Sequence, residues 1–118
     1  MFVIFQERKK TEFGEYLVKS IRESGLSQAE FISKVGIARP YFYDMLKNSP
    51  PPKETLEKMI NVFKEVFPNN EMMEIEIIDI AAKCRDEIPA DINDMIKKHP
   101  EHWEDIRKML LGIENEGE

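Results

Sequence analysis

The stretch that decides the fold of this chain is Leu26–Lys47, LSQAEFISKVGIARPYFYDMLK. It begins with a helix-start pattern, because Ser27 can cap a helix and Glu30 can bond back to the Ser27 amide. Gly36 ends the first apolar pattern, at a place where a chain leaving a helix often needs a positive φ. Pro40 falls near the first turn of a second helix, where its missing N–H has no cost. The pattern predicts two short helices joined by a tight turn, a helix-turn-helix.

Each of these two helices carries an apolar stripe at helical spacing. The stripe of the first helix is Ala29, Ile32 and Val35. The stripe of the second is Phe42, Met45 and Leu46. We expect these residues to face the core, so that the remaining side chains of the second helix point away from it.

These residues resemble the Cro/repressor-type helix-turn-helix of phage repressors and XRE-type bacterial regulators. The family's usual run is Leu-Ser-Gln, Leu-Ala, a Gly with an aliphatic residue and Ser, and then Tyr-Leu-Ser. The resemblance covers residues 11–67 and implies an all-α, lambda-repressor-like five-helix DNA-binding domain with a C-terminal helical extension. Ala38 replaces the family's Ser or Thr cap, a loss of ~1 kcal/mol. Asn48 stands where Gly is common, and asparagine tolerates the left-handed conformation.

The resemblance also implies which residues would touch DNA, with the helix over residues 39–47 reading the major groove. The base-reading positions map onto Arg39, Pro40, Tyr41 and Asp44. Candidate phosphate contacts are Gln28, Tyr43, Lys47, Lys53, Lys9 and Lys10. Arg39 can pair with guanine O6 and N7, and Asp44 can accept a hydrogen bond from cytosine N4. The alternative is that these side chains form an ordinary exposed polar face.

The rest of the chain divides into three parts by the same reasoning. Residues 1–10 form a basic arm or a solvated leader, with Arg8 beside Lys9 and Lys10, and with the apolar Met1–Phe5 as a strand or plug. Residues 11–67 form the DNA-binding domain, with helices over Glu12–Ser24 and Thr55–Phe67 flanking the motif and an extended proline connector at 49–52. Residues 68–118 form an acidic helical extension.

The extension is harder to interpret. Residues 72–82 alternate in part like a strand, but their length favours a helix, and two helices should follow over Ala90–Lys98 and Pro100–Ile113. Asp79–Lys83 and Ile88–Ile92 are similar to the segment after the DNA-binding domain in some XRE-type regulators. Repressor-type domains usually bind palindromic operators as two-fold dimers, so we expect a homodimer. The extension is then a dimerisation element or, alternatively, an intramolecular cap.

Charge is divided unevenly along the chain. Residues 1–53 carry nine basic and six acidic residues, and residues 54–118 carry eight basic and seventeen acidic ones. The net charge of −6 does not exclude DNA, because screening beyond ~8 Å lets a basic half and an acidic half act separately. The basic half is compatible with double-stranded DNA and the acidic half with a protein partner.

The chain shows no pattern typical of catalysis or of cofactor binding. Cys84, His99 and His102 do not have the number or spacing of a structural zinc site, so we expect no metal. A single cysteine fits a reducing cytoplasm, and the sequence predicts neither a membrane span nor an enzyme.

Two functions from different classes follow from these observations. The first is a sequence-specific DNA-binding transcriptional regulator, a repressor of phage-like type. The second is a protein-interaction module with the helix-turn-helix fold, such as an antitoxin or adaptor, whose acidic half binds a partner.

Overall fold

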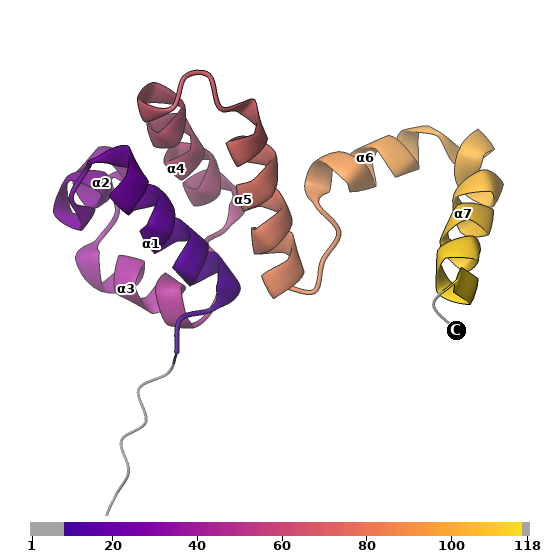
Figure 1. The fold of residues 1–118 in the computed structure, drawn as a ribbon, viewed down its shortest axis with the longest axis horizontal. Helices are drawn as coiled ribbons and strands as arrows, with labels where there is room; N and C mark the ends of the chain where they lie inside the picture. The colour runs from indigo at the N-terminus through magenta and orange to yellow at the C-terminus, as the bar shows by residue number, and fades with distance from the viewer. Residues whose placement is uncertain (1–8, 117–118) are drawn as a thin grey trace, which may run out of the picture. The chain divides into compact units, whose positions relative to one another are not determined.

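The computed structural model of the chain describes residues 9–116, and all regular structure within that range is helical (Figure 1). The elements are α1 (Glu12–Ser24), α2 (Gln28–Val35), α3 (Arg39–Lys47), α4 (Lys53–Val66), α5 (Glu71–Cys84), α6 (Ala90–Lys98), the 3-10 helix η1 (Pro100–His102) and α7 (Trp103–Glu116). The all-α prediction is therefore confirmed. The chain forms two compact units, with unit 1 ending at Glu87 and unit 2 beginning at Ile88. Arg8 and the Met1–Phe5 segment lie outside the described residues.

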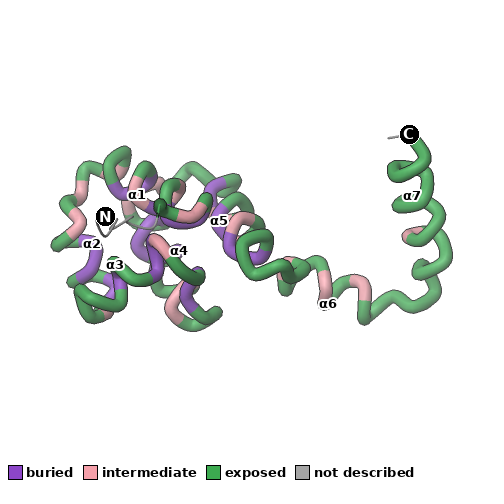
Figure 2. Tube along the Cα trace, turned by 90° about the horizontal axis from the view of Figure 1, so that it is seen from below, coloured by how far each residue is buried: buried purple, intermediate pink, exposed green. Residues whose placement is uncertain are grey.

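The core of unit 1 is made by all five of its helices, and Figure 2 shows buried residues in each of them. Phe31 of α2 is fully buried, and its ring lies 5.0 Å from that of Phe63 on α4 and 6.2 Å from that of Phe42 on α3. The predicted stripe of α2 is wrong at Ala29, which is exposed. Burying a phenylalanine removes far more apolar area from water than burying an alanine, so α2 is turned to place Phe31 inside.

The predicted caps fix where the helices begin and end. Ser27 and Glu30 form both bonds of the capping box, at 3.0 and 3.2 Å. Gly36 ends α2 with φ +81°, and Ala38 makes no side-chain cap, both as predicted. Asn48 does not adopt the left-handed conformation that asparagine tolerates. Its φ is −115°, and its side-chain amide instead donates a hydrogen bond to the Asp44 carboxylate one turn earlier.

Helix α5 confirms the helical interpretation of residues 72–82 and belongs to unit 1. The hydroxyl of Tyr16 on α1 donates to Glu76 of α5 at 2.9 Å. Met73, Ile77 and Ala81 of α5 are buried in the same core as α1 and α4. The division expected after residue 67 therefore lies after Glu87. Pro68–Asn70 breaks the helix without ending the domain, because α5 supplies apolar surface that covers the other helices.

The end of α5 also holds the proline connector in place. The guanidinium of Arg85 donates to the carbonyl oxygens of Pro50, at 2.6 Å, and of Pro51. Both prolines are buried. The connector that leaves α3 is thus fixed by a residue thirty-five positions further along the chain.

The Tyr16–Glu76 contact leads to a testable dependence of stability on pH. Burial, and then the hydrogen bond to Glu76, raises the pKa of Tyr16 to about 12. The folded protein keeps the Tyr16 proton above the pH at which the unfolded chain releases it. The stabilisation that comes from this difference in pKa is therefore fully present below pH 10 and is lost as the pH rises towards 12. We expect the difference in unfolding free energy between the wild type and Tyr16→Phe to fall across this range in denaturant titrations. A difference that is constant with pH would contradict the assignment.

Unit 2 has a different character, because no residue from Ala90 to Glu116 is buried. The indole N–H of Trp103 donates to the Ile96 carbonyl at 2.6 Å and joins α7 to the end of α6. The bounds of α6 agree with the predicted helix. The predicted helix over Pro100–Ile113 is a 3-10 turn followed by α7, which continues to Glu116.

Candidate nucleic-acid interface

The outer face of α3 is the surface that the sequence singles out. Phe42, Met45 and Leu46 are buried, at 0%, 1% and 3% exposure, so the predicted inner stripe is confirmed. The opposite side of the helix is exposed and consists of Arg39, Pro40, Tyr41, Tyr43 and Asp44. The helix therefore presents one arginine, two aromatic rings and one carboxylate to solvent.

The position of α3 depends on a close contact with α1. The carbonyl oxygen of Leu46 accepts hydrogen bonds from the backbone N–H of Thr11, at 3.0 Å, and from the Thr11 hydroxyl, at 3.4 Å. Gly14, buried in the first turn of α1, lies against the backbone of Leu46. These contacts fix the C-terminal end of α3 on the first turn of α1.

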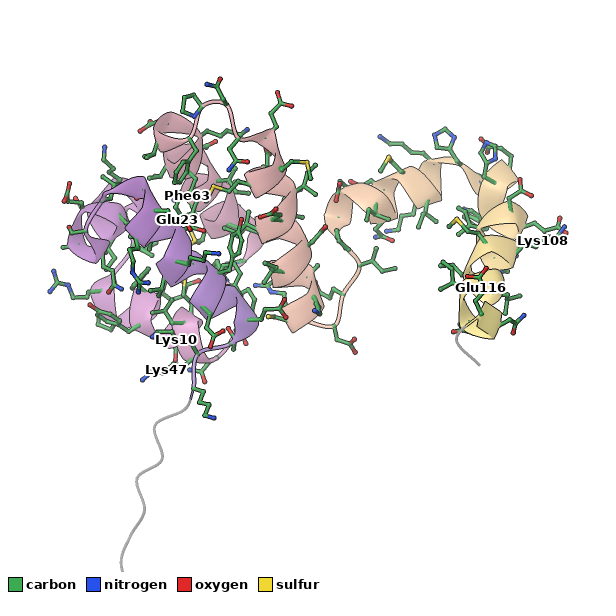
Figure 3. All side chains as sticks on the ribbon, viewed as in Figure 1. Lys10, Glu23, Lys47, Phe63, Lys108 and Glu116 are labelled. Atoms are coloured by element: carbon green, nitrogen blue, oxygen red, sulfur yellow. The ribbon has the colours of Figure 1, made fainter. Side chains whose placement is uncertain are left out.

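The same contact brings basic residues together that are far apart in the sequence. Because Thr11 is bonded to Leu46, the chain just before α1 runs beside the end of α3. Figure 3 shows the Lys10 and Lys47 side chains at that same end of unit 1. Lys9 and Lys10 are exposed, and Lys47 is half-buried. The structure thus groups three of the predicted phosphate contacts.

The polar groups on the outer face are not equally free to move. Asp44 accepts the hydrogen bond from Asn48, which orients its carboxylate along the helix. The ring of Tyr43 packs edge-on against Phe42, with 5.4 Å between the ring centroids, and the residue is 45% exposed. Within residues 9–116 the Arg39 guanidinium has no hydrogen-bond or ion-pair partner, and its side chain is exposed at the start of the helix.

Gln28 begins α2 and is half-buried. The capping box satisfies the Glu30 amide, while the amides of Gln28 and Ala29 have no partner within the helix. The N-terminus of a helix with free amides favours the binding of an anion, although the negative charge of the nearby Glu30 carboxylate reduces that preference. Lys53 is exposed at the first position of α4, beyond the proline connector.

Sequence reasoning missed the residues that hold this face in place. Gly14, Phe31 and Arg85 act across helices through contacts that no local spacing reveals. Gly14 offered one signal, because a glycine inside an otherwise apolar helix face often marks a close backbone approach.

Unit 1 also contains a cavity away from α3. This cavity of about 210 Å³ between α4 and α5 is lined mainly by apolar side chains, with the Lys64–Glu74 ion pair, 3.2 Å apart, among its residues. Within residues 9–116, no three His, Cys, Asp or Glu side chains gather as a metal site, and no helix there is long and apolar enough to cross a membrane.

Comparisons with family models, with curated proteins and with solved structures give no match to this chain. The functional assignment therefore depends on the geometry of unit 1 and on the residues of the helix-turn-helix.

Proposed function

We propose that this protein is a sequence-specific DNA-binding transcriptional regulator of the Cro/repressor helix-turn-helix type, with a lambda-repressor-like unit 1. The observation that carries the proposal is the exposed outer face of α3, which begins with Arg39 and stands on a packed helical body. A repressor is the favoured kind of regulator, because this motif resembles that of phage repressors.

The dimensions of α3 suit the major groove. An α-helix with its side chains is ~10–12 Å in diameter, and the groove is ~12 Å wide and ~8.5 Å deep. In this docking mode the N-terminal residues of the second helix meet the base edges. Arg39 would then bind guanine with two hydrogen bonds, while Tyr41 would place its ring against a thymine methyl group.

Phosphate contacts on either side of α3 would set its register on the duplex. The start of α2, with Gln28, supplies one candidate contact. The Lys9, Lys10 and Lys47 group supplies another at the far end of α3. The acidic half of the chain lowers non-specific affinity for DNA, so discrimination among sequences would depend on base contacts more than on net charge.

A selection of bound sequences from random duplex DNA tests this proposal. We expect the wild type to enrich one sequence motif, and Arg39→Ala to lose ~10–100-fold of its preference at one base pair, the value of a bidentate guanine contact. Lys47→Ala should instead weaken binding to all sequences alike and lower the salt slope by about one.

Arg22→Ala is the matched control, because it removes the same kind of side chain from an exposed position of α1 that is not among the candidate DNA contacts. Its base preferences should equal those of the wild type. If no sequence is enriched, or if Arg39→Ala leaves the enriched motif unchanged, the regulator proposal is wrong.

The alternative, a protein-interaction module such as an antitoxin or adaptor, is favoured by one observation. Unit 2 exposes many large apolar side chains, which are typical of a surface that binds protein. This alternative predicts a stable complex with another protein and no effect of Arg39→Ala on the protein's affinity for DNA.

A further inference from the structure

The cavity of about 210 Å³ lies next to the turn at residues 68–70, which joins α4 to α5 (Figure 1). Its inner wall is apolar and is formed by buried side chains of both helices, which are Ile60, Phe63, Met73 and Ile77. Other lining residues, among them Lys64, Pro68 and Glu71, are exposed, so the cavity opens to solvent on their side. Sites for small molecules in proteins are concave and largely apolar in this way, with a few polar groups.

The volume of the cavity sets the size of the molecule that fits it. Liquid water occupies ~30 Å³ per molecule, so the cavity holds several waters. Its apolar wall offers these waters few hydrogen bonds, so an apolar group that replaces them lowers the free energy. An apolar cavity of ~150 Å³ is large enough for benzene. This cavity therefore fits one six-membered ring with a short substituent.

Two phenylalanine rings in the wall favour an aromatic ligand. Phe63 and Phe67 both line the cavity, and their ring centroids are 6.4 Å apart with the planes tilted by 32°. Aromatic rings attract one another at centroid distances of ~4.5–7 Å, in stacked or edge-to-face arrangements, so a ring inside the cavity can contact both. The ring of Phe63 also stacks on that of Phe31, at 5.0 Å, which fixes this part of the wall before any ligand binds.

The charged residues that line the cavity select the sign of the ligand's charge. They are one lysine and two glutamates, Lys64, Glu71 and Glu74. Lys64 and Glu74 neutralise each other in an ion pair of 3.2 Å. The side chain of Glu71, in the first turn of α5, has no hydrogen-bond or ion-pair partner within residues 9–116. One carboxylate is therefore free to pair with a cation, while an anion would be repelled.

We propose that this cavity is a binding site for a small aromatic amine. The ring of the ligand lies against Phe63 and Phe67, and its ammonium group pairs with the Glu71 carboxylate at the opening. The residues that line the site belong to α4, α5 and the turn between them, and none belongs to α3. The inference therefore does not depend on DNA binding.

Nuclear magnetic resonance of the full chain, with labelled methionine methyl groups, tests the proposal. The probe is 2-phenylethylammonium, which joins one ring to a charge through a two-carbon arm. We expect saturable binding with a Kd on the order of 0.1–1 mM, which is typical of a ligand of this size. The ring current of the probe should shift the methyl signal of Met73, which lines the cavity. The signal of Met59, which is buried but does not line the cavity, should stay in place.

Two variants separate the contribution of the charge from that of the ring. Glu71→Gln should weaken binding of the probe ~2–5-fold, the value of an exposed ion pair. Its matched control is Glu65→Gln, which removes the same charge from an exposed position of α4 that does not line the cavity, and which should bind like the wild type. Phe67→Leu should weaken binding ~2–10-fold, the value of an aromatic pair, and circular dichroism should show that each variant is folded.

A second probe tests the sign of the charge without any substitution. 3-Phenylpropanoate has the same ring on an arm of the same length, but it ends in a carboxylate. We expect it to bind at least ~5-fold more weakly than 2-phenylethylammonium, because Glu71 repels it.

Three results would overturn the proposal. The first is a Met73 signal that does not shift at probe concentrations well above the expected Kd. The second is equal binding of the two probes, or an equal effect of Glu71→Gln and Glu65→Gln, since the carboxylate at the opening would then select nothing. The third is a shift of Met95 and Met109 in place of Met73, which would mean that the amine binds only to exposed apolar side chains of unit 2.

Discussion

Replacement of Gly14 by alanine is expected to destabilise unit 1 by about 1–3 kcal/mol, the usual cost of overpacking a filled core. The same change inside most helices is stabilising by ~0.5–1 kcal/mol, so the predicted effect has the opposite sign. The reason is the contact with α3. A Cβ at Gly14 would lie 2.8 Å from the carbonyl carbon of Leu46 and 2.9 Å from its Cα, and closer still to its oxygen. These are backbone atoms, which a change of rotamer cannot move away.

Denaturant titration followed by circular dichroism measures this effect. The control is Gly112→Ala, which adds the same methyl group to a helix of unit 2 at a position where the new Cβ would meet open space. We expect Gly112→Ala to leave unit 1 unchanged and to increase the helicity of α7. If Gly14→Ala stabilises unit 1, the close approach of α1 and α3 is not present in solution.

Because Leu46 lies in the last turn of α3, Gly14→Ala should also disturb the proposed DNA-binding face. A methyl group that pushes Leu46 away from α1 moves the end of α3 where Lys47 and the Lys9–Lys10 dipeptide meet. Affinity for DNA should therefore fall even under conditions in which the variant is still folded.

Local chemistry explains how much of this fold could be predicted from the sequence. The Ser27–Glu30 capping box, the glycine at position 36 and the stripe of α3 each act over one or two turns, and all three are present in the structure. The exposed face of α3 follows directly from its stripe, while the choice of base-reading residues on that face is what the family resemblance implies. The capping box and the stripe fix a helix by its own residues, without reference to the rest of the chain.

The parts that could not be predicted depend on contacts between distant residues. Whether Ala29 or Phe31 faces inward depends on α3 and α4, which provide the rings against which Phe31 packs. The extent of unit 1 depends on α5 covering α1, through contacts such as Tyr16–Glu76 that join residues sixty positions apart. The grouping of Lys10 with Lys47 likewise requires the Thr11–Leu46 bond. Sequence spacing carries no information about any of these distances.

Phe31→Ala is expected to have the largest effect on stability of any change proposed for this chain, a loss of ~3–5 kcal/mol. Small domains have a total stability of only ~5–15 kcal/mol, so the variant should be partly unfolded near physiological temperature. Phe31 is 0% exposed, and its ring packs on those of Phe42 and Phe63, so its removal leaves a cavity between α2, α3 and α4.

Phe31→Leu separates the loss of volume from the loss of the ring. A leucine keeps most of the apolar volume, and we expect a cost below ~1.5 kcal/mol, as for other hydrophobic swaps of similar size. Unfolding should be followed by circular dichroism or by hydrogen exchange of the α4 amides, because Trp103 lies in unit 2 and not in this core. A cost for Phe31→Ala as small as that for Phe31→Leu would mean that Phe31 does not join the three helices. The orientation of α3, on which the proposed reading of DNA depends, would then need a different support.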